Sequence, residues 1–300
     1  MGTLVQRKHT ISIHFAKAVL SHFAHDSVEI NALLTLSGIN TKLFNNSRAR
    51  ITPRQLSQLI KAISFKLKDE LLGLANPAMP LGSFLLLARN ALHCNSLFDV
   101  YKNTELALRT MTTSLSMELK VSEGQAQVSF KVKPENKDDL VILTEFILLI
   151  WHRFPSWLAN KKIPLLEVCL PYDRTEHESE YKLMFSAKVR FNSDEAMLVF
   201  PLDCLDFSCQ RSLEELSQYI EQLPESWFKR LEFDKSISQE CIRHISSSTD
   251  SSMEAVAQKM KRSVRTLRRN LIAENTHFKK IKALYLRDKA IHLLSETNFP

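Results

Sequence analysis

A nine-residue run near the carboxyl end of the chain carries the side chains best suited to a binding chemistry. Residues 263–271 read Ser-Val-Arg-Thr-Leu-Arg-Arg-Asn-Leu. Three apolar residues follow the roughly 3.6-residue period of one helix face: Val264, Leu267 and Leu271. Three arginines lie off this stripe: Arg265, Arg268 and Arg269. Because an arginine guanidinium can pair with guanine O6 and N7, such a helix could read DNA.

The residues before this run supply the rest of a DNA-binding motif. A short helix is expected over residues 252–259, with the small Ala257 allowing close helix packing, and Ser263 can cap the second helix. A helix, a tight turn and a second amphipathic helix form a helix-turn-helix, whose second helix enters the major groove. The predicted DNA contacts are Ser263, Arg265, Thr266, Arg268 and Arg269, with Thr266 assigned to a phosphate or a thymine methyl group.

The net charge of the chain is concentrated at this end. Residues 249–300 hold eleven Lys and Arg against five Asp and Glu, which gives +6 of the total of +7. A basic patch of this kind is the electrostatic footprint of a nucleic-acid binder. The alternative is an ordinary surface helix with a solvated basic face. The turn length, the cap and the concentrated charge favour DNA binding.

The run resembles the first helix-turn-helix of an AraC/XylS-type transcription regulator. The family pattern is a Ser-x-Arg-x-Leu-x-Arg recognition helix, followed by a Gly-x-x-Phe exit into a long connecting helix. Here the exit is Asn275 to Phe278, and the connecting helix is expected over residues 281–295. Two residues depart from the pattern. Asn275 replaces the exit glycine and tolerates left-handed backbone, whereas Lys261 replaces a turn glycine and would be strained at positive φ.

The resemblance also implies a second helix-turn-helix, which this chain would be starting at Pro300. The expectation is therefore a regulator that ends before its second unit, with half of its DNA-reading surface missing. A single unit contacts few phosphates and base edges, so we expect weak, salt-sensitive binding unless the chain dimerises.

The first 225 residues predict an α+β domain. Asp138 and Asp139 open a strongly apolar helix, and alternating residues around Glu123-Gly124 predict a β-hairpin. Helices are expected over residues 53–72, 83–92, 97–108, 138–150 and 213–223, and strands over 117–121, 126–132, 165–170, 187–191 and 197–200. Residues 38–205 resemble the arabinose-binding-type N-terminal domain of the same family, in part through Leu72-Gly73-Leu74.

Two domains follow from this reading. Residues 1–225 are predicted to form a mixed helix and antiparallel-sheet domain for effector binding or dimerisation, and residues 235–300 an all-α, truncated helix-turn-helix domain beginning with a helix over 237–245. The predicted partners are double-stranded DNA, a small-molecule effector and a second copy of the chain. The effector is unknown, and four polar residues could line its pocket: Arg89, His93, Tyr101 and Arg109.

Other classes of protein find little support. The five cysteines are scattered, and the Cys204/Cys209 pair lacks a second pair at zinc-site spacing, so no metal or other cofactor is expected. No acid–base pair or nucleophile motif predicts an enzyme.

The longest apolar run, residues 141–151, is too short for a membrane span and contains Glu145. With no secretory signal, the cytoplasm is the expected compartment. The alternative function is an interaction protein that forms heterodimers without binding DNA.

Overall fold

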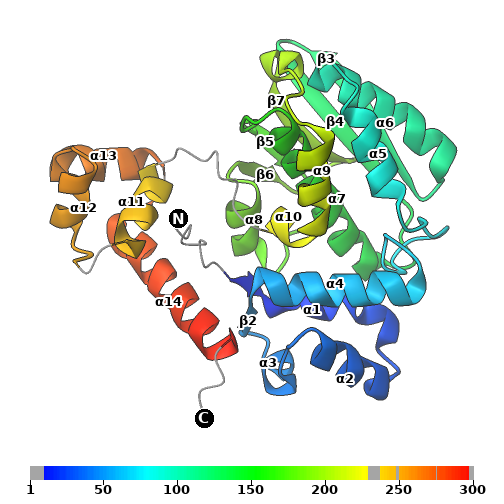
Figure 1. Ribbon diagram of the computed structural model, residues 1–300, viewed down its shortest axis with the longest axis horizontal. Coiled ribbons are helices and arrows are strands. Elements are labelled where there is room, and N and C mark those ends of the chain that lie inside the picture. The colour runs from blue at the N-terminus through cyan, green and yellow to red at the C-terminus, as the bar shows by residue number, and fades with distance from the viewer. Residues whose placement is uncertain (1–9, 229–236, 248–249, 275, 297–300) are drawn as a thin grey trace. The chain divides into compact units, whose positions relative to one another are not determined.

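The computed structural model describes residues 10–228, 237–247, 250–274 and 276–296 (Figure 1). These residues form two compact units. The larger unit comprises residues 11–49 and 53–228, and the smaller one is built mainly from residues 237–296. The larger unit combines helices with a sheet and the smaller one is helical, which confirms the predicted α+β fold with an all-α carboxyl-terminal part.

A five-stranded sheet forms the centre of the larger unit. Its strand order is β3-β4-β7-β5-β6. The strands are β3 (Leu115–Ser122), β4 (Gln125–Val132), β5 (Glu167–Cys169), β6 (Lys188–Arg190) and β7 (Ala196–Pro201). All neighbours pair antiparallel except β5 and β6, which are parallel. The sheet is therefore mixed, whereas the sequence predicted only antiparallel pairing, because the connection between β5 and β6 contains the unpredicted helix α8 (Glu178–Met184).

The predicted hairpin is confirmed. Ser122 pairs with Gln125 across the turn, and Glu123 and Gly124 have φ of 47° and 77°. Two central residues with positive φ match a two-residue hairpin turn whose twist suits the flanking strands. The register places Leu119 opposite Val128, so the alternating apolar residues of both strands lie on the same buried face.

Helix α7 (Lys137–Leu158) is the central helix of this unit and packs against β4 and β7 (Figure 1). Asn136 caps it by accepting the backbone N–H groups of Asp138 and Asp139. It is long and apolar enough to cross a membrane, but 78% of its most apolar 18-residue window is buried within the protein. Its buried residues include Glu145 and His152, as expected for the core helix of a folded domain.

The remaining helices of the larger unit surround this core. They are α1 (Ile13–Val19), α2 (Ser27–Leu36), α3 (Thr41–Asn45), α4 (Pro53–Leu67), α5 (Ser83–Ala91), α6 (Leu97–Met111), α9 (Leu213–Glu221) and α10 (Glu225–Phe228); β1 (Ile11–Ser12) and β2 (Arg50–Ile51) are two-residue strands. The sequence predicted no element before residue 53. It also extended α4 to residue 72, but the helix ends at Leu67 because Lys68 turns to φ 53°.

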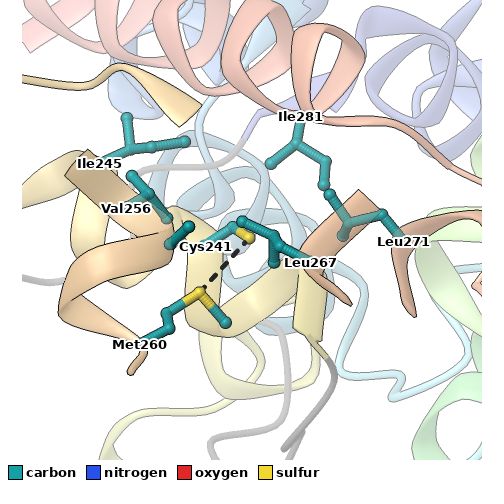
Figure 2. Close-up of a cluster of buried hydrophobic side chains, with 8 residues drawn as sticks. Cys241, Ile245, Val256, Met260, Leu267, Leu271 and Ile281 are labelled. Carbon is teal, nitrogen blue, oxygen red and sulfur yellow. Dashed lines mark hydrogen bonds between the residues drawn. The ribbon is translucent and has the colours of Figure 1, made fainter. Parts of the chain in front are cut away.

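Among its described residues from 237 to 296, the smaller unit contains four helices. They are α11 (Ile237–Ser246), α12 (Met253–Lys259), α13 (Val264–Ala273) and α14 (Phe278–Glu296). One cluster of buried side chains joins all four: Cys241, Ile245, Val256, Ala257, Met260, Leu267, Leu271 and Ile281 (Figure 2). The helix predicted over 281–295 begins three residues earlier, at Phe278.

Candidate nucleic-acid interface and effector cavity

Serine hydroxyls start both helices of the predicted motif. Ser252 Oγ accepts the backbone N–H of Ala255 at 3.2 Å at the start of α12. Ser263 Oγ accepts the N–H of Thr266 at 3.1 Å at the start of α13. Each bond satisfies one of the amides that a helix leaves unpaired at its amino end. The cap predicted at Ser263 therefore lies where α13 begins.

The turn between α12 and α13 is built on left-handed backbone at Lys261, whose φ is 51°. The N–H of Lys261 bonds to the carbonyl oxygen of Gln258 at 3.0 Å, and that of Arg262 bonds to the carbonyl oxygen of Ala257 at 2.9 Å. These two bonds form a Schellman motif, which normally has glycine at the left-handed position. Lys261 therefore adopts a conformation that glycine would adopt without strain.

Replacing Lys261 with glycine should therefore stabilise the helical unit. We expect Lys261→Gly to raise the free energy of unfolding by up to about 1 kcal/mol, since left-handed backbone costs a non-glycine residue about 1–2 kcal/mol and the greater freedom of glycine in the unfolded chain offsets part of that gain. Urea unfolding followed by circular dichroism measures the change. Lys261→Ala is the control: it removes the same charge but keeps the strain. Equal stability of the two variants would contradict this account of the turn.

The inner face of α13 packs into the core of the helical unit. Leu267 is fully buried and Leu271 nearly so, while Val264 is partly buried against the same cluster. Ala257 of α12 is also buried in this cluster. In Figure 2, Leu267 lies next to Cys241, whose thiol is 3.8 Å from the Met260 sulfur. Burial raises the pKa of the Cys241 thiol to about 11, so this cysteine acts as a small apolar residue.

The outer face of α13 presents three arginines. Arg265, Arg268 and Arg269 are exposed, and their i, i+3 and i+4 spacing places them on one side of the helix. None of the ion pairs among the described residues involves them. By contrast, Arg262 lies 3.9 Å from the Glu240 carboxylate. The three guanidinium groups are therefore available to an anionic partner.

The two hydroxyl-bearing residues of the predicted site have a different role in the structure. Ser263 Oγ and Thr266 Oγ1 lie 2.9 Å apart and bond to each other, while Ser263 also caps α13. Ser263 is exposed and Thr266 is half-buried. A hydroxyl has two lone pairs and one proton, so contact with a phosphate would share groups that already hold the helix start.

One residue that the sequence analysis missed also positions the motif. The carboxylate of Glu274, just after α13, accepts the N–H groups of Ile237 at 2.6 Å and Ser238 at 2.9 Å. A carboxylate at the start of α11 satisfies free amides and complements the helix dipole. Its partners are 36 and 37 residues away, so no local spacing could indicate it. The predicted exit residue Asn275 lies outside the described residues.

A small apolar cavity lies inside the larger unit. Its volume is about 50 Å³. The lining residues come from α4, α7, α10 and the segment after α4, and among them are Leu72, Leu143, Ile147, Trp227 and Glu70. Drug-sized ligand pockets usually measure roughly 300–1,000 Å³. The cavity therefore has room for a small apolar group. To bind a sugar, the cavity would have to widen and gain polar partners for the sugar hydroxyls.

The wall of this cavity includes Leu72 and Leu74 from the segment that follows α4. Buried Asp69 accepts three backbone N–H groups, from Leu71, Gly73 and Met79, at 2.7–2.9 Å. Next to it, Glu70 accepts the N–H groups of residues 82 and 84. Burial nevertheless raises the pKa of Glu70 above its usual range. The two carboxylates organise the loop, so the polar groups at this wall already have partners.

The four polar residues proposed as pocket liners do not line this cavity. Tyr101 is buried elsewhere and donates its hydroxyl to the carbonyl oxygen of Trp151. Arg109 is exposed and pairs with Glu105 at 2.6 Å. Arg89 and His93 are exposed at the surface. Helical periodicity indicates which face of a helix is buried and not which cavity the face borders, so a ligand-binding role for these four residues stays a prediction.

The described residues thus form an α+β domain that is followed along the chain by a helical unit whose helix α13 has a basic outer face. The family model described as the arabinose-binding domain of AraC transcription regulator, N-terminal, matches residues 28–208. The chain therefore belongs to the AraC-type transcription regulators that carry this N-terminal domain, which confirms the resemblance inferred from the sequence.

A solved structure similar to that of this chain is the transcriptional regulator CdpR from Pseudomonas aeruginosa. The two chains are 16% identical, with a TM-score of 0.37, and the match covers 95% of this chain and 87% of CdpR. No curated protein matches the chain.

Proposed function

We propose that this protein regulates transcription by binding DNA through α13 and by sensing a small molecule through its α+β domain. The observation that carries the proposal is the division of α13 into two faces. Leu267 and Leu271 anchor one face in the core, and the opposite face holds three exposed arginines without ion-pair partners among the described residues. A helix fixed in this way can place its guanidinium groups in a DNA groove, and no existing ion pair has to be broken first.

The three arginines and the neighbouring lysines are proposed to make different kinds of contact with DNA. Arg265, Arg268 and Arg269 are placed at base edges or nearby phosphates, because the planar guanidinium bonds bidentately to guanine or phosphate. Lys279 and Lys280 are exposed at the start of α14, where they can contact phosphates only. Each phosphate contact makes the slope of log K against log salt concentration more negative by about 0.9. A single motif would therefore bind weakly, and a homodimer in the cytoplasm would read two half-sites.

The cavity of the larger unit is the proposed effector site. Its apolar walls favour a small apolar ligand or ligand group. Such a ligand would regulate the protein only if it bound one conformation better than another, since differential affinity is what shifts a population. The walls come from α4, α7 and α10, so widening of the cavity would move these helices against one another.

Fluorescence anisotropy tests the proposed function. The full chain is titrated against a duplex from its own upstream promoter and against a scrambled duplex of the same length, across a salt series. Preference for the promoter duplex that survives moderate salt supports sequence reading by α13. Equal and steeply salt-dependent binding to both duplexes would mean that the protein contacts phosphates without reading the base sequence. Absence of binding, with dimerisation retained, would favour the alternative of an interaction protein that acts through heterodimers.

A further inference from the structure

Three ionisable side chains from distant parts of the sequence meet inside the α+β domain. His14 lies in α1, Glu145 lies in α7, and His177 directly precedes α8. Each offers one nitrogen or oxygen atom, and these three atoms all lie within 4.8 Å of one another. The two imidazole rings stack with their centroids 3.8 Å apart. The cluster contains no cysteine and no lysine, so its donors are nitrogen and carboxylate oxygen.

The carboxylate at the centre of the cluster is fully buried and only partly satisfied. The side chain of Glu145 is 0% exposed. Its Oε1 atom receives the Tyr181 hydroxyl at 2.6 Å and lies 2.6 Å from His177 Nε2. Its Oε2 atom and His14 Nε2 are both buried and have no hydrogen-bond partner among the described residues. Leaving a buried polar atom unpaired is costly, more so for a charged group, so two such atoms in one cluster point to a ligand between them.

The types of the donors indicate what that ligand would be. Two imidazoles and one carboxylate are a known donor set for Zn²⁺ and for other first-row transition metals. Mg²⁺ and Ca²⁺ prefer ligand sets made of oxygen atoms.

We propose that His14, Glu145 and His177 form a binding site for a divalent late first-row transition metal such as Zn²⁺. With metal–ligand bonds of about 2.0–2.1 Å, donor atoms around one tetrahedral ion lie about 3.3 Å apart. Donor atoms now separated by up to 4.8 Å therefore need to approach by about 1.5 Å at most. The contact between His177 and Glu145 is exchanged for bonds to the metal.

The three proposed ligands come from three separate parts of the α+β domain. A metal ion would link α1 to α7 and to the start of α8, all within the α+β domain. Tyr181 would be a positioning residue, because its hydroxyl holds Glu145 Oε1 in place. Three protein ligands also leave a fourth position for water or for a donor atom of a small molecule. The sequence predicted no metal because the Cys204/Cys209 pair lacks a second pair at zinc-site spacing, whereas these ligands are brought together by tertiary structure.

Metal titration of the full chain tests the site. The protein is stripped with a chelator, and Zn²⁺ binding is measured by competition with a chromophoric chelator. We expect one equivalent to bind, and His14→Ala, Glu145→Gln and His177→Ala each to weaken binding by at least about 100-fold. Tyr181→Phe should weaken it by about 10- to 100-fold, the range for groups that orient a metal ligand. His93→Ala removes an exposed histidine and should bind like the unmodified chain.

Co²⁺ distinguishes this site from adventitious binding to cysteines. Co²⁺ bound to nitrogen and oxygen ligands shows visible d–d absorption without a thiolate charge-transfer band, and Glu145→Gln should abolish it. This replacement has the shape of the original residue, and circular dichroism of the metal-free variants shows whether they fold. Failure of the folded, unmodified chain to bind Zn²⁺ or Co²⁺ would overturn the proposal. A thiolate charge-transfer band in the Co²⁺ spectrum, or an unchanged metal affinity of Glu145→Gln, would also overturn the proposal. None of these readouts depends on DNA binding.

Discussion

Replacing Arg269 with alanine is expected to abolish most of the preference of the protein for its own promoter while leaving its fold intact. A good bidentate arginine–guanine contact contributes about 1–3 kcal/mol of discrimination, which corresponds to roughly 5- to 150-fold in relative affinity. Arg269 is exposed and forms no ion pair among the described residues, so its removal leaves no buried group unsatisfied. Anisotropy with promoter and scrambled duplexes measures the loss.

A matched arginine separates the loss of a base contact from the loss of one positive charge. Arg243 is exposed on α11 of the same helical unit, and Arg243→Ala lowers the net charge by the same amount. We expect this variant to weaken binding to both duplexes equally, if at all, because charge alone carries no sequence information. If Arg269→Ala discriminates between the duplexes as well as the unmodified chain does, the assignment of Arg269 to a base edge is wrong.

Truncating Leu267 to alanine should unfold much of the helical unit. Leu267 is fully buried, and its cluster joins all four helices of the unit (Figure 2). Core leucine-to-alanine changes cost about 2–5 kcal/mol through lost burial and the cavity left behind. A unit of about 60 residues has little stability in reserve. We expect a lower urea midpoint for this unit, loss of DNA binding and an unchanged transition for the larger domain.

Two variants of the same helix serve as controls for that result. Leu267→Met keeps the volume and should cost less than about 1.5 kcal/mol. Ile272→Ala removes an apolar side chain that is 63% exposed and should change stability by no more than about 0.5 kcal/mol. If Leu267→Ala leaves the urea midpoint within the range of these controls, the cluster does not hold the unit together.

Elements with a strong local signal were predicted well from the sequence. The hairpin around Glu123-Gly124 was predicted because alternation and turn residues both act within a few positions. The stripe of Leu267 and Leu271 was predicted for the same reason, since helical period alone decides which face is apolar. The position of Lys261 in a glycine-type turn was also visible, although only the backbone shows that its φ is positive.

Elements with a weak local signal were missed. The helices before residue 53 carry short apolar stretches, and α2 has little amphipathic contrast, so their helical state depends on packing against neighbours such as α4. The parallel pairing of β5 and β6 was missed as well, because strand direction is set by the connection between the strands and not by their composition.

By itself, the sequence determined the basic outer face of α13, its buried stripe, its serine cap and the membership of the chain in a regulator family. Each of these depends on residues that are close in the chain, where helical geometry converts spacing into position. The tertiary structure alone decided that Glu274 caps α11, that an apolar cavity lies beside Glu70, and that His14, Glu145 and His177 converge. The three members of that cluster lie in α1, in α7 and just before α8, far apart in the chain, and only packing of the whole domain brings such side chains close together.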